Sequence, residues 1–220
     1  MAKLIYKYPI ILASTSKARH ELLNQIHVDH QVVAPLIDEE QLKANFKNHN
    51  LFELARHLAQ SKAASVSKEY ADCIVIAADQ IGEFHTSPFF KPETRENNIR
   101  MLHQLSGQQH KQHTSTVVYF NNKPIHHISS SATLNMRELT EAEIFAYVDH
   151  DKAWNCCGGY RFEGMGKHLF NHVDGDFDNI LGLPIIPLLN FLHAHHYLQL
   201  VDDEQAIIET KEWEEKFSLS

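Results

Sequence analysis

The chain has 220 residues, of which 43% are hydrophobic and 22% are charged, a composition typical of a soluble globular protein with one large domain or two small ones. Eight glycines and seven prolines without a triplet period exclude the collagen-like and low-complexity classes. The formal net charge of −8 argues against broad electrostatic binding to nucleic acid or to an anionic membrane, but it leaves room for a small anionic ligand in a local basic pocket.

The cysteines and the apolar runs bear on the compartment. Three cysteines, two of them adjacent, predict a reducing environment rather than a disulfide framework. The N-terminal residues lack the apolar stretch of a signal peptide, and no run approaches the ~20 apolar residues of a membrane-spanning helix. We therefore expect a cytoplasmic protein. The seventeen histidines show no zinc-ligand spacing with the cysteines, and we interpret them as ordinary surface or partly buried residues.

The first half of the chain alternates between strand and helix patterns. The apolar run over 9–13 predicts a strand, and the hydroxyl residues at 14–16 offer N-caps for a helix that runs through Ile26. The patterns that follow predict a strand over 30–37, a helix over 51–70, a buried strand over 73–78 that ends at Asp79, and a helix over 94–105.

In the second half, the pattern first predicts a hairpin with strands over 113–120 and 123–136, and then a helix from a capping box at Thr140 to about Asp149. A glycine-rich segment over 155–179 follows, and a closing helix is predicted from Leu183 to about 195. Such glycine density is typical of tight turns or of a close approach between backbone and ligand. Because helices and strands alternate and at least one strand pair is antiparallel, we expect an α/β layered fold on a mixed, twisted sheet.

The end of the chain differs from the rest in charge. Residues 198–220 contain seven acidic and two basic residues, and the pattern over 203–217 predicts a helix with its apolar side chains on one face. We therefore divide the chain into a domain over 1–197 and an acidic extension over 198–220.

The most informative stretch for function is 12–23, where a strand runs into a hydroxyl-rich turn and then into a helix. Free backbone N–H groups and the positive end of a helix dipole together suit a phosphate group. Arg19 in the first turn is unfavourable for the helix itself. On this stretch alone, the simpler interpretation is that Ser14 is a plain N-cap and that Arg19 is solvated.

A series of short motifs accompanies this stretch. They are the segments 12–16 with Arg19, 37–39, 58–63, 78–80, 91–92, 105–107, 163–166 and 179–184. Each alone is weak, but together and in this order they resemble the Maf family, the septum-formation-inhibitor-like nucleotide pyrophosphatases, across residues 9–195. The resemblance implies an α/β fold similar to that of the inosine triphosphate pyrophosphatases. It also implies a divalent metal cofactor, Mg²⁺ or Mn²⁺, and cleavage of a nucleoside triphosphate to the monophosphate and pyrophosphate.

The resemblance gives phosphate-binding roles to Ser14, Arg19, Lys62 and Lys91. A triphosphate carries several negative charges, so the three cations would attract it while the Ser14 hydroxyl and the turn amides donate hydrogen bonds. Without the resemblance, Lys62 would be interpreted as part of a solvated helix face and Lys91 as a loop charge.

Two carboxylates complete the expected chemistry. Glu39 and Asp79 are hard oxygen ligands of the kind that magnesium or manganese takes when it shares phosphate oxygens with a substrate. Open α/β sheets bind ligands at the carboxyl ends of strands, where we expect Asp79 to lie. We assign Asp79 as the general base that activates water, the alternative being a helix-cap or turn aspartate.

Three positions bear on which base is bound. Gln80 and Glu163 resemble the branch of the family that prefers 7-methyl-GTP, whereas the branch that acts on dTTP and UTP carries Thr and Gln there. A carboxylate at Glu163 matches the two adjacent donors of guanine. Ala18 departs from the tryptophan-bearing pattern of the first branch, a loss for which Tyr160 or Phe162 would compensate by stacking on the base.

Two further features depart from the pattern or invite another mechanism. Phe90 stands where the family usually has Gly. Cys156 and Cys157 lie next to the expected pocket, but no neighbouring residue forms a Cys/His arrangement with them, so we interpret both as small packing residues.

The expected partner is a nucleoside triphosphate substrate, with no nucleic acid and no membrane, and we leave a homodimer open. Two alternatives remain: a pyrophosphatase for dTTP or UTP, and a non-catalytic regulator of cell division that acts through the acidic extension. A binding module would not need the basic and acidic site residues together, so their joint presence favours the enzyme.

Overall fold

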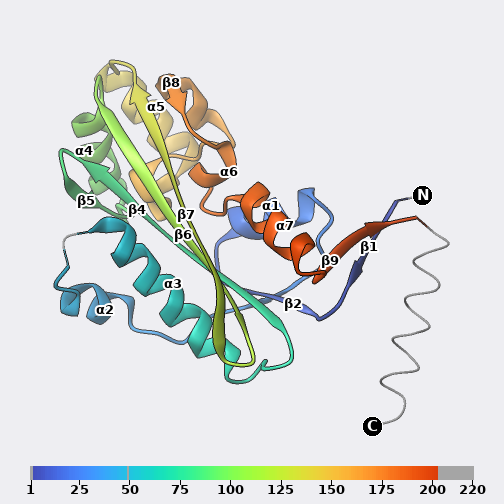
Figure 1. The fold of residues 1–220 in the computed structure, drawn as a ribbon. Helices are drawn as coiled ribbons and strands as arrows, with labels where there is room; N and C mark the ends of the chain where they lie inside the picture. The colour runs from blue at the N-terminus through green and yellow to red at the C-terminus, as the bar shows by residue number, and fades with distance from the viewer. Residues whose placement is uncertain (1, 49, 203–220) are drawn as a thin grey trace, which may run out of the picture.

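The computed structural model describes residues 2–48 and 50–202. Its centre is a mixed sheet with the strand order β3-β2-β4-β6-β7-β8 and with β5 paired to β4, while β1 and β9 form a separate antiparallel pair (Figure 1). The strands are β1 Lys3–Tyr6, β2 Ile10–Ala13, β3 Gln31–Val33, β4 Ile74–Phe84, β5 Ser87–Phe89, β6 Gln109–Phe120, β7 Lys123–Met136, β8 Phe170–Asp174 and β9 Leu198–Val201.

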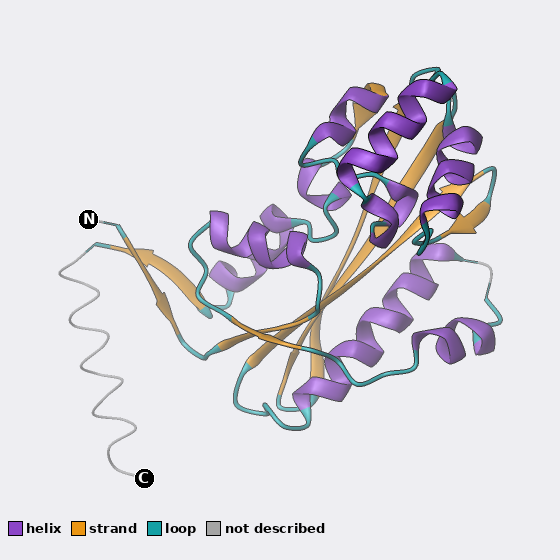
Figure 2. Ribbon diagram, turned by 180° about the vertical axis from the view of Figure 1, so that it is seen from behind, coloured by secondary structure: helices purple, strands orange, loops and turns teal. Residues whose placement is uncertain are grey.

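Helices pack around this sheet and, in the view of Figure 2, gather in two groups on either side of the long crossing strands. The α-helices are α1 Lys17–Gln25, α2 Glu39–Asn45, α3 Leu51–Ser67, α4 Arg95–Leu105, α5 Glu141–Asp151, α6 Phe177–Ile180 and α7 Ile185–Ala194. Three short 3₁₀ turns lie at Ala153–Asn155, Cys157–Gly159 and Met165–Leu169. The expected α/β layered fold on a mixed sheet is therefore confirmed.

Side-chain alternation along β2 and β4 produces two apolar layers. On one face of the sheet, Leu12 and Ile76 belong to a buried cluster with residues of α1 and α7. On the other face, Ile11 and Val75 pack against the alanine-rich side of α3. Because successive residues of a strand point to opposite faces, a continuous apolar run is what a strand covered on both sides requires.

Most of the predicted elements are present. The apolar run over 9–13 forms β2, and the helices predicted over 51–70 and 94–105 are α3 and α4. The predicted hairpin is β6–β7, and its turn residues Asn121 and Asn122 have φ angles of 50° and 59°, as a tight hairpin turn demands. The capping box at Thr140 begins α5.

Two predicted strands have other bounds. The strand expected over 30–37 covers only Gln31–Val33, because its partner β2 ends at Ala13 and Pro35 has no N–H to continue a ladder. The strand expected to end at Asp79 continues to Phe84, because antiparallel β6 supplies partners, among them Ser115 for Asp79. The pairing of β4 with β2 stops at Ile76, so Asp79 still lies beyond the carboxyl end of its parallel neighbour.

The segment expected as an acidic extension begins inside the fold. Leu198–Val201 forms β9 and pairs with β1, and Leu198 is fully buried in the same cluster as α1 and α7. The helix predicted over 203–217 lies outside the described residues. Residues 198–201 are therefore part of the packed structure.

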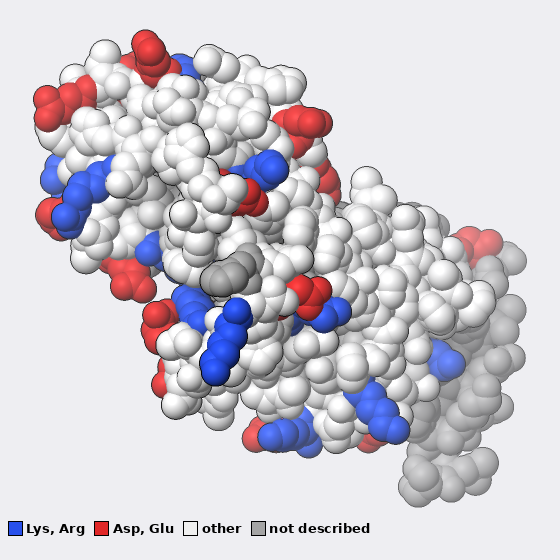
Figure 3. Space-filling view, turned by 60° about the vertical axis from the view of Figure 1, so that its left-hand side comes forward, with Lys and Arg blue, Asp and Glu red and all other residues white. Residues whose placement is uncertain are grey.

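The surface in Figure 3 carries basic and acidic side chains that are interspersed over the face shown. Of the helices in residues 2–48 and 50–202, none has both the length and the apolar character that crossing a bilayer would require.

Candidate active site

The candidate site begins where β2 ends. Ser14 follows the strand directly and is buried, and Ser16, not Ser14, is the N-cap of α1, since its hydroxyl accepts from the Arg19 N–H. The Ser14 Oγ instead accepts from the Ser16 N–H at 3.1 Å and from Arg19 Nη1 at 3.3 Å. The interpretation of Ser14 as a plain N-cap is therefore wrong.

Arg19 points inward rather than into solvent. Its side chain is buried, and its Nε donates to the Gly182 carbonyl at 2.7 Å. Gly182 has a φ of 92°, and a Cβ added there would lie 3.1 Å from Arg19 Nε. Both the backbone conformation and the close contact therefore favour glycine at this position. Burial lowers the pKa of Arg19, an effect that the nearby charges of Asp79 and Glu39 oppose. The solvated alternative for Arg19 is therefore wrong.

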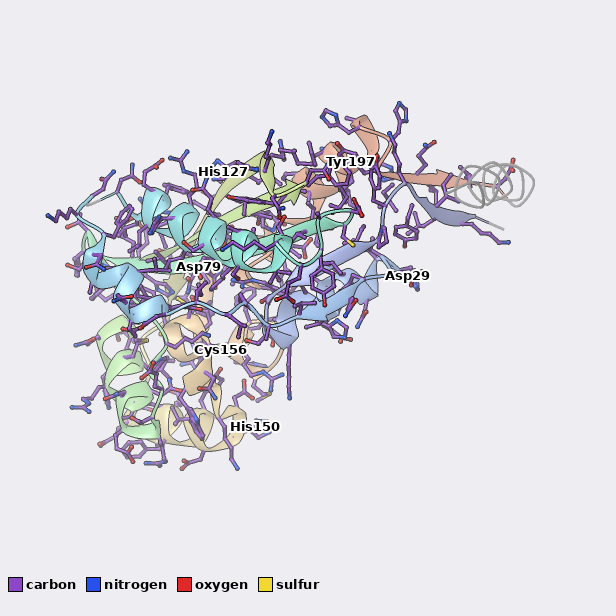
Figure 4. The ribbon with its side chains drawn as sticks, turned by 90° about the horizontal axis from the view of Figure 1, so that it is seen from below. Asp29, Asp79, His127, His150, Cys156 and Tyr197 are labelled. Atoms are coloured by element: carbon purple, nitrogen blue, oxygen red, sulfur yellow. The ribbon has the colours of Figure 1, made fainter. Side chains whose placement is uncertain are left out.

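Lys62 joins the two carboxylates. It lies on α3, donates to Asp79 Oδ1 in a direct ion pair, and contacts Glu39 Oε1 at 3.0 Å. The side chains of Lys62 and Asp79 are each 9% exposed, whereas that of Glu39 is 41% exposed. Figure 4 shows Asp79 beside α3, on the face of β4 that this helix covers. The solvated helix face considered for Lys62 is therefore wrong.

Glu39 is the first residue of α2, a helix that the sequence analysis does not anticipate. Asp38 is the N-cap and accepts from the Gln41 N–H at 2.9 Å, so the signal was an N-cap followed by two glutamates in the first turn. Burial acts to raise the pKa of Glu39, but the attraction of Lys62, followed by Lys43 and Lys91, outweighs it and lowers that pKa.

Lys91 lies at the exposed rim of this group. It follows β5 and precedes the buried Pro92. Its charge is close enough to contribute to the lowered pKa of Glu39. The structure thus brings Ser14, Arg19, Lys62 and Asp79 into one buried polar cluster, which we call the phosphate-side cluster, with Glu39 and Lys91 at its edge.

The positions expected to bind the base are arranged differently. Glu163 is 35% exposed and contacts Arg161 Nε at 3.3 Å. Ala18 is half-buried on α1. Tyr160 and Phe162 belong to the buried apolar cluster with α4 and α5, so the idea that either compensates for Ala18 by stacking on a base is wrong.

Gln80 points away from Asp79, because neighbouring residues of β4 face opposite sides. Its Nε2 lies 2.8 Å from the Asn179 carbonyl oxygen, 3.0 Å from the Ile180 carbonyl oxygen and 3.2 Å from Thr114 Oγ1. Thr114 was not among the expected site residues, since a threonine inside a strand carries no signal of its own. Asn179 and Gly182 lie in the motif at 179–184.

The adjacent cysteines, Cys156 and Cys157, lie between the phosphate-side cluster and the positions expected to bind the base. Burial raises the pKa of Cys157 to about 12 and raises that of Cys156, with contributions from Asp79 to the first thiol and from Glu163 to the second. Figure 4 places Cys156 in the part of the molecule adjoining Asp79. Neutral, protonated thiols agree with the interpretation of these residues as packing residues.

The two carboxylates fit a divalent metal ion only when oxygens of the substrate complete its set of ligands. Glu39 and Asp79 both contact Lys62 and offer hard oxygen ligands, the chemistry that Mg²⁺ or Mn²⁺ prefers. Within residues 2–48 and 50–202, no three or more His, Cys, Asp or Glu side chains gather to hold an ion. Phosphate oxygens and water would therefore supply the remaining ligands.

Comparison with known proteins gives a consistent result. A family model described as Maf-like protein matches residues 9–195. A protein of Legionella pneumophila (strain Corby) named nucleoside triphosphate pyrophosphatase is 38% identical over 192 residues, or 87% of this chain and 96% of that protein. Proteins of the same name from Rhodopseudomonas palustris are 38% identical over 192 residues (strain BisB18; 86% and 95%) and 35% identical over 194 residues (strain BisB5; 87% and 96%).

Proposed function

This chain belongs to the Maf family, and we propose that it hydrolyses a nucleoside triphosphate to the monophosphate and pyrophosphate with a divalent metal ion. The name shared by the relatives, nucleoside triphosphate pyrophosphatase, supports this activity. The observation that carries the proposal is the phosphate-side cluster, in which buried Arg19 and Lys62 stand beside Asp79.

The cluster has the charges that such a reaction needs. Arg19 and Lys62 are buried cations, and a triphosphate is a stronger partner for them than water. Ser14 offers a hydroxyl at the same point, and Lys91 brings a third cation from the exposed rim. Preorganised cations in a partly buried site also stabilise the charge that develops on the leaving pyrophosphate.

Asp79 is the proposed general base. Its carboxylate accepts a proton from water while the water oxygen attacks the α-phosphorus and the bond to the pyrophosphate oxygen breaks. Lys62 contacts this carboxylate and fixes its orientation from α3. Glu39, held by the same lysine, lies at the more exposed edge of the cluster.

Glu39 and Asp79 would hold the metal ion together with substrate oxygens. Bound Mg²⁺ or Mn²⁺ supplies charge neutralisation and orientation of the phosphate chain. The two carboxylates also bind Lys62, so this lysine keeps them together when no substrate is present.

For the base we propose 7-methylguanine, on the strength of Glu163. An exposed carboxylate near the site pairs with adjacent donors of guanine, and a base made cationic by methylation adds a charge attraction. Arg161 Nε contacts Glu163 Oε1 at 3.3 Å, so it competes for that oxygen and must release it before both carboxylate oxygens can pair with the base.

One assay tests substrate and metal together. Purified full-length protein is given 7-methyl-GTP, GTP, dTTP, UTP and ATP in turn, and pyrophosphate release is measured with Mg²⁺, with Mn²⁺ and after exhaustive chelation. We expect the highest kcat/KM for 7-methyl-GTP, no turnover after chelation, and recovery when metal is added. Faster cleavage of dTTP or UTP would reject the base while keeping the reaction. Turnover that survives chelation would reject the metal.

A further inference from the structure

We propose that Gln80 and Thr114 are positioning residues that hold the turn at 179–182. This turn then fixes the direction of the Arg19 side chain. The inference rests on the proposed function in one respect, which is that Arg19 binds phosphate. It gives Gln80 a role that acts through the phosphate side of the site.

The turn is held through one carbonyl group. The Asn179 carbonyl oxygen accepts from Thr114 Oγ1 at 3.0 Å, from Gln80 Nε2 at 2.8 Å and from the Gly182 N–H at 3.0 Å. Thr114 and Asn179 are fully buried, so water cannot replace these donors. Side chains from two adjacent strands, β4 and β6, therefore hold the end of α6.

The Gln80 amide has no hydrogen left for a substrate. Its NH₂ group carries two hydrogens, and three acceptors surround it: the carbonyl oxygens of Asn179 and Ile180 and the Thr114 hydroxyl. A base acceptor would have to displace one of these part-buried hydrogen bonds to reach the NH₂ group. The geometry thus favours a role in the fold of the turn.

The turn then reaches Arg19. The Gly182 N–H is bonded to the Asn179 carbonyl, and the carbonyl of the same glycine accepts from Arg19 Nε at 2.7 Å. With Nε fixed in this way, Nη1 lies 3.3 Å from Ser14 Oγ at the end of β2. A continuous series of hydrogen bonds therefore runs from Thr114 and Gln80 to the guanidinium group.

The neighbouring strand position provides a matched control. Thr116 lies on the same strand and the same face as Thr114 and is also fully buried, but its hydroxyl has no hydrogen-bond partner. Thr114→Val and Thr116→Val make the same chemical change two residues apart. Only the first removes a donor to the turn. Thr114→Ser keeps that donor and serves as the rescue variant.

The first readout does not depend on activity. In ¹⁵N-labelled full-length protein, the Arg19 Nε–H resonance is assigned by its absence in Arg19→Lys, and its exchange with solvent is measured by NMR. We expect exchange about two- to tenfold faster in Thr114→Val, the range for losing one hydrogen bond, with Thr116→Val and Thr114→Ser close to wild type. Equal exchange in Thr114→Val and Thr116→Val would overturn the proposal even if the protein proved to have no pyrophosphatase activity.

The second readout separates positioning from base recognition. Inorganic tripolyphosphate carries no base, so a residue that only contacts the base leaves its binding unchanged. We expect Gln80→Met and Thr114→Val to weaken tripolyphosphate binding by about two- to tenfold, and to have less than about twofold effect in an Arg19→Lys background. Both variants should lower kcat/KM for all nucleotides in the same proportion.

Two results would overturn the role of Gln80. One is a changed ratio of kcat/KM between 7-methyl-GTP and UTP in Gln80→Met with unchanged tripolyphosphate binding. The other is an equal loss of binding in the wild-type and Arg19→Lys backgrounds. Gln80→Met and Thr114→Val lie on different strands, so each variant tests the turn independently if the other does not fold. Failure of wild-type protein to bind tripolyphosphate would reject the phosphate role of Arg19, and the exchange measurement would still decide the positioning role.

Discussion

The two sides of the candidate site are built in opposite ways. On the phosphate side, Arg19, Lys62 and Asp79 are buried, and each is held by a partner from a different element of the fold. On the base side, Glu163 is 35% exposed and its partner Arg161, two residues away, is 51% exposed. One side is thus fixed by long-range contacts, and the other by a local surface pair.

This difference predicts how each side responds to change. A buried charge whose partner is removed keeps its desolvation cost, so substitutions on the phosphate side should have large effects on every substrate. An exposed pair is screened by solvent and contributes little to stability, so substitutions on the base side should alter preference between substrates and leave the fold intact.

The largest effect is expected for Asp79→Asn. A neutral amide cannot accept the proton of water, so we expect turnover to fall by about 10²–10⁴-fold, with nucleotide binding reduced much less. Pyrophosphate release and binding of a non-hydrolysable nucleotide, measured on the same preparation, separate the two effects.

Glu83→Gln provides the matched control for this substitution. Glu83 lies on the same strand and the same face as Asp79, and its contact is His113 at 2.5 Å. We expect turnover of Glu83→Gln within about threefold of wild type, as for a group outside the chemistry. More than about a tenth of wild-type activity in Asp79→Asn would reject the general-base role.

A smaller and more selective effect is expected for Glu163→Gln. Loss of one acceptor oxygen should lower the preference for 7-methyl-GTP over UTP by about tenfold, while kcat/KM for UTP stays near the wild-type value. Arg161→Gln should act in the other direction, since it frees the Oε1 oxygen of Glu163 that Arg161 Nε contacts. An equal fall for both nucleotides in Glu163→Gln would show that the base side is built like the phosphate side.

The same contrast separates what the sequence predicts from what it does not. Ser14 follows a short apolar strand, Arg19 lies in the first turn of the next helix, and Asp79 follows the apolar run that begins β4. Their motifs predicted these elements and the polar groups beside them. The extent of β4 was not predictable from its own residues. The strand continues past Asp79 because β6, which is 30 residues further along the chain, supplies the ladder partners.

Long-range contacts explain the other differences. β9 pairs with β1 across nearly the whole chain, and neither segment has a pattern that identifies its partner. Tyr160 and Phe162 looked available to stack on a base, yet α4 and α5 cover them. Thr114 and Gln80 meet Asn179 only in the folded structure, so their shared role had no signature in the sequence.

The smallest effect is expected at the boundary between the two sides. Cys156 lies near Glu163 and Cys157 lies near Asp79, a position that would suit a nucleophilic thiol. A pKa of about 12 for Cys157 instead leaves, near pH 8, a thiolate fraction about a thousandfold below that of an ordinary thiol. We therefore expect Cys156→Ala and Cys157→Ala to keep turnover within about threefold of wild type, because neither thiol takes part in the chemistry. Native protein should also react with iodoacetamide at pH 8 far more slowly than urea-unfolded protein, as followed by mass spectrometry. Rapid alkylation of either cysteine that abolishes turnover, and that bound nucleotide prevents, would instead place a reactive thiol in the site.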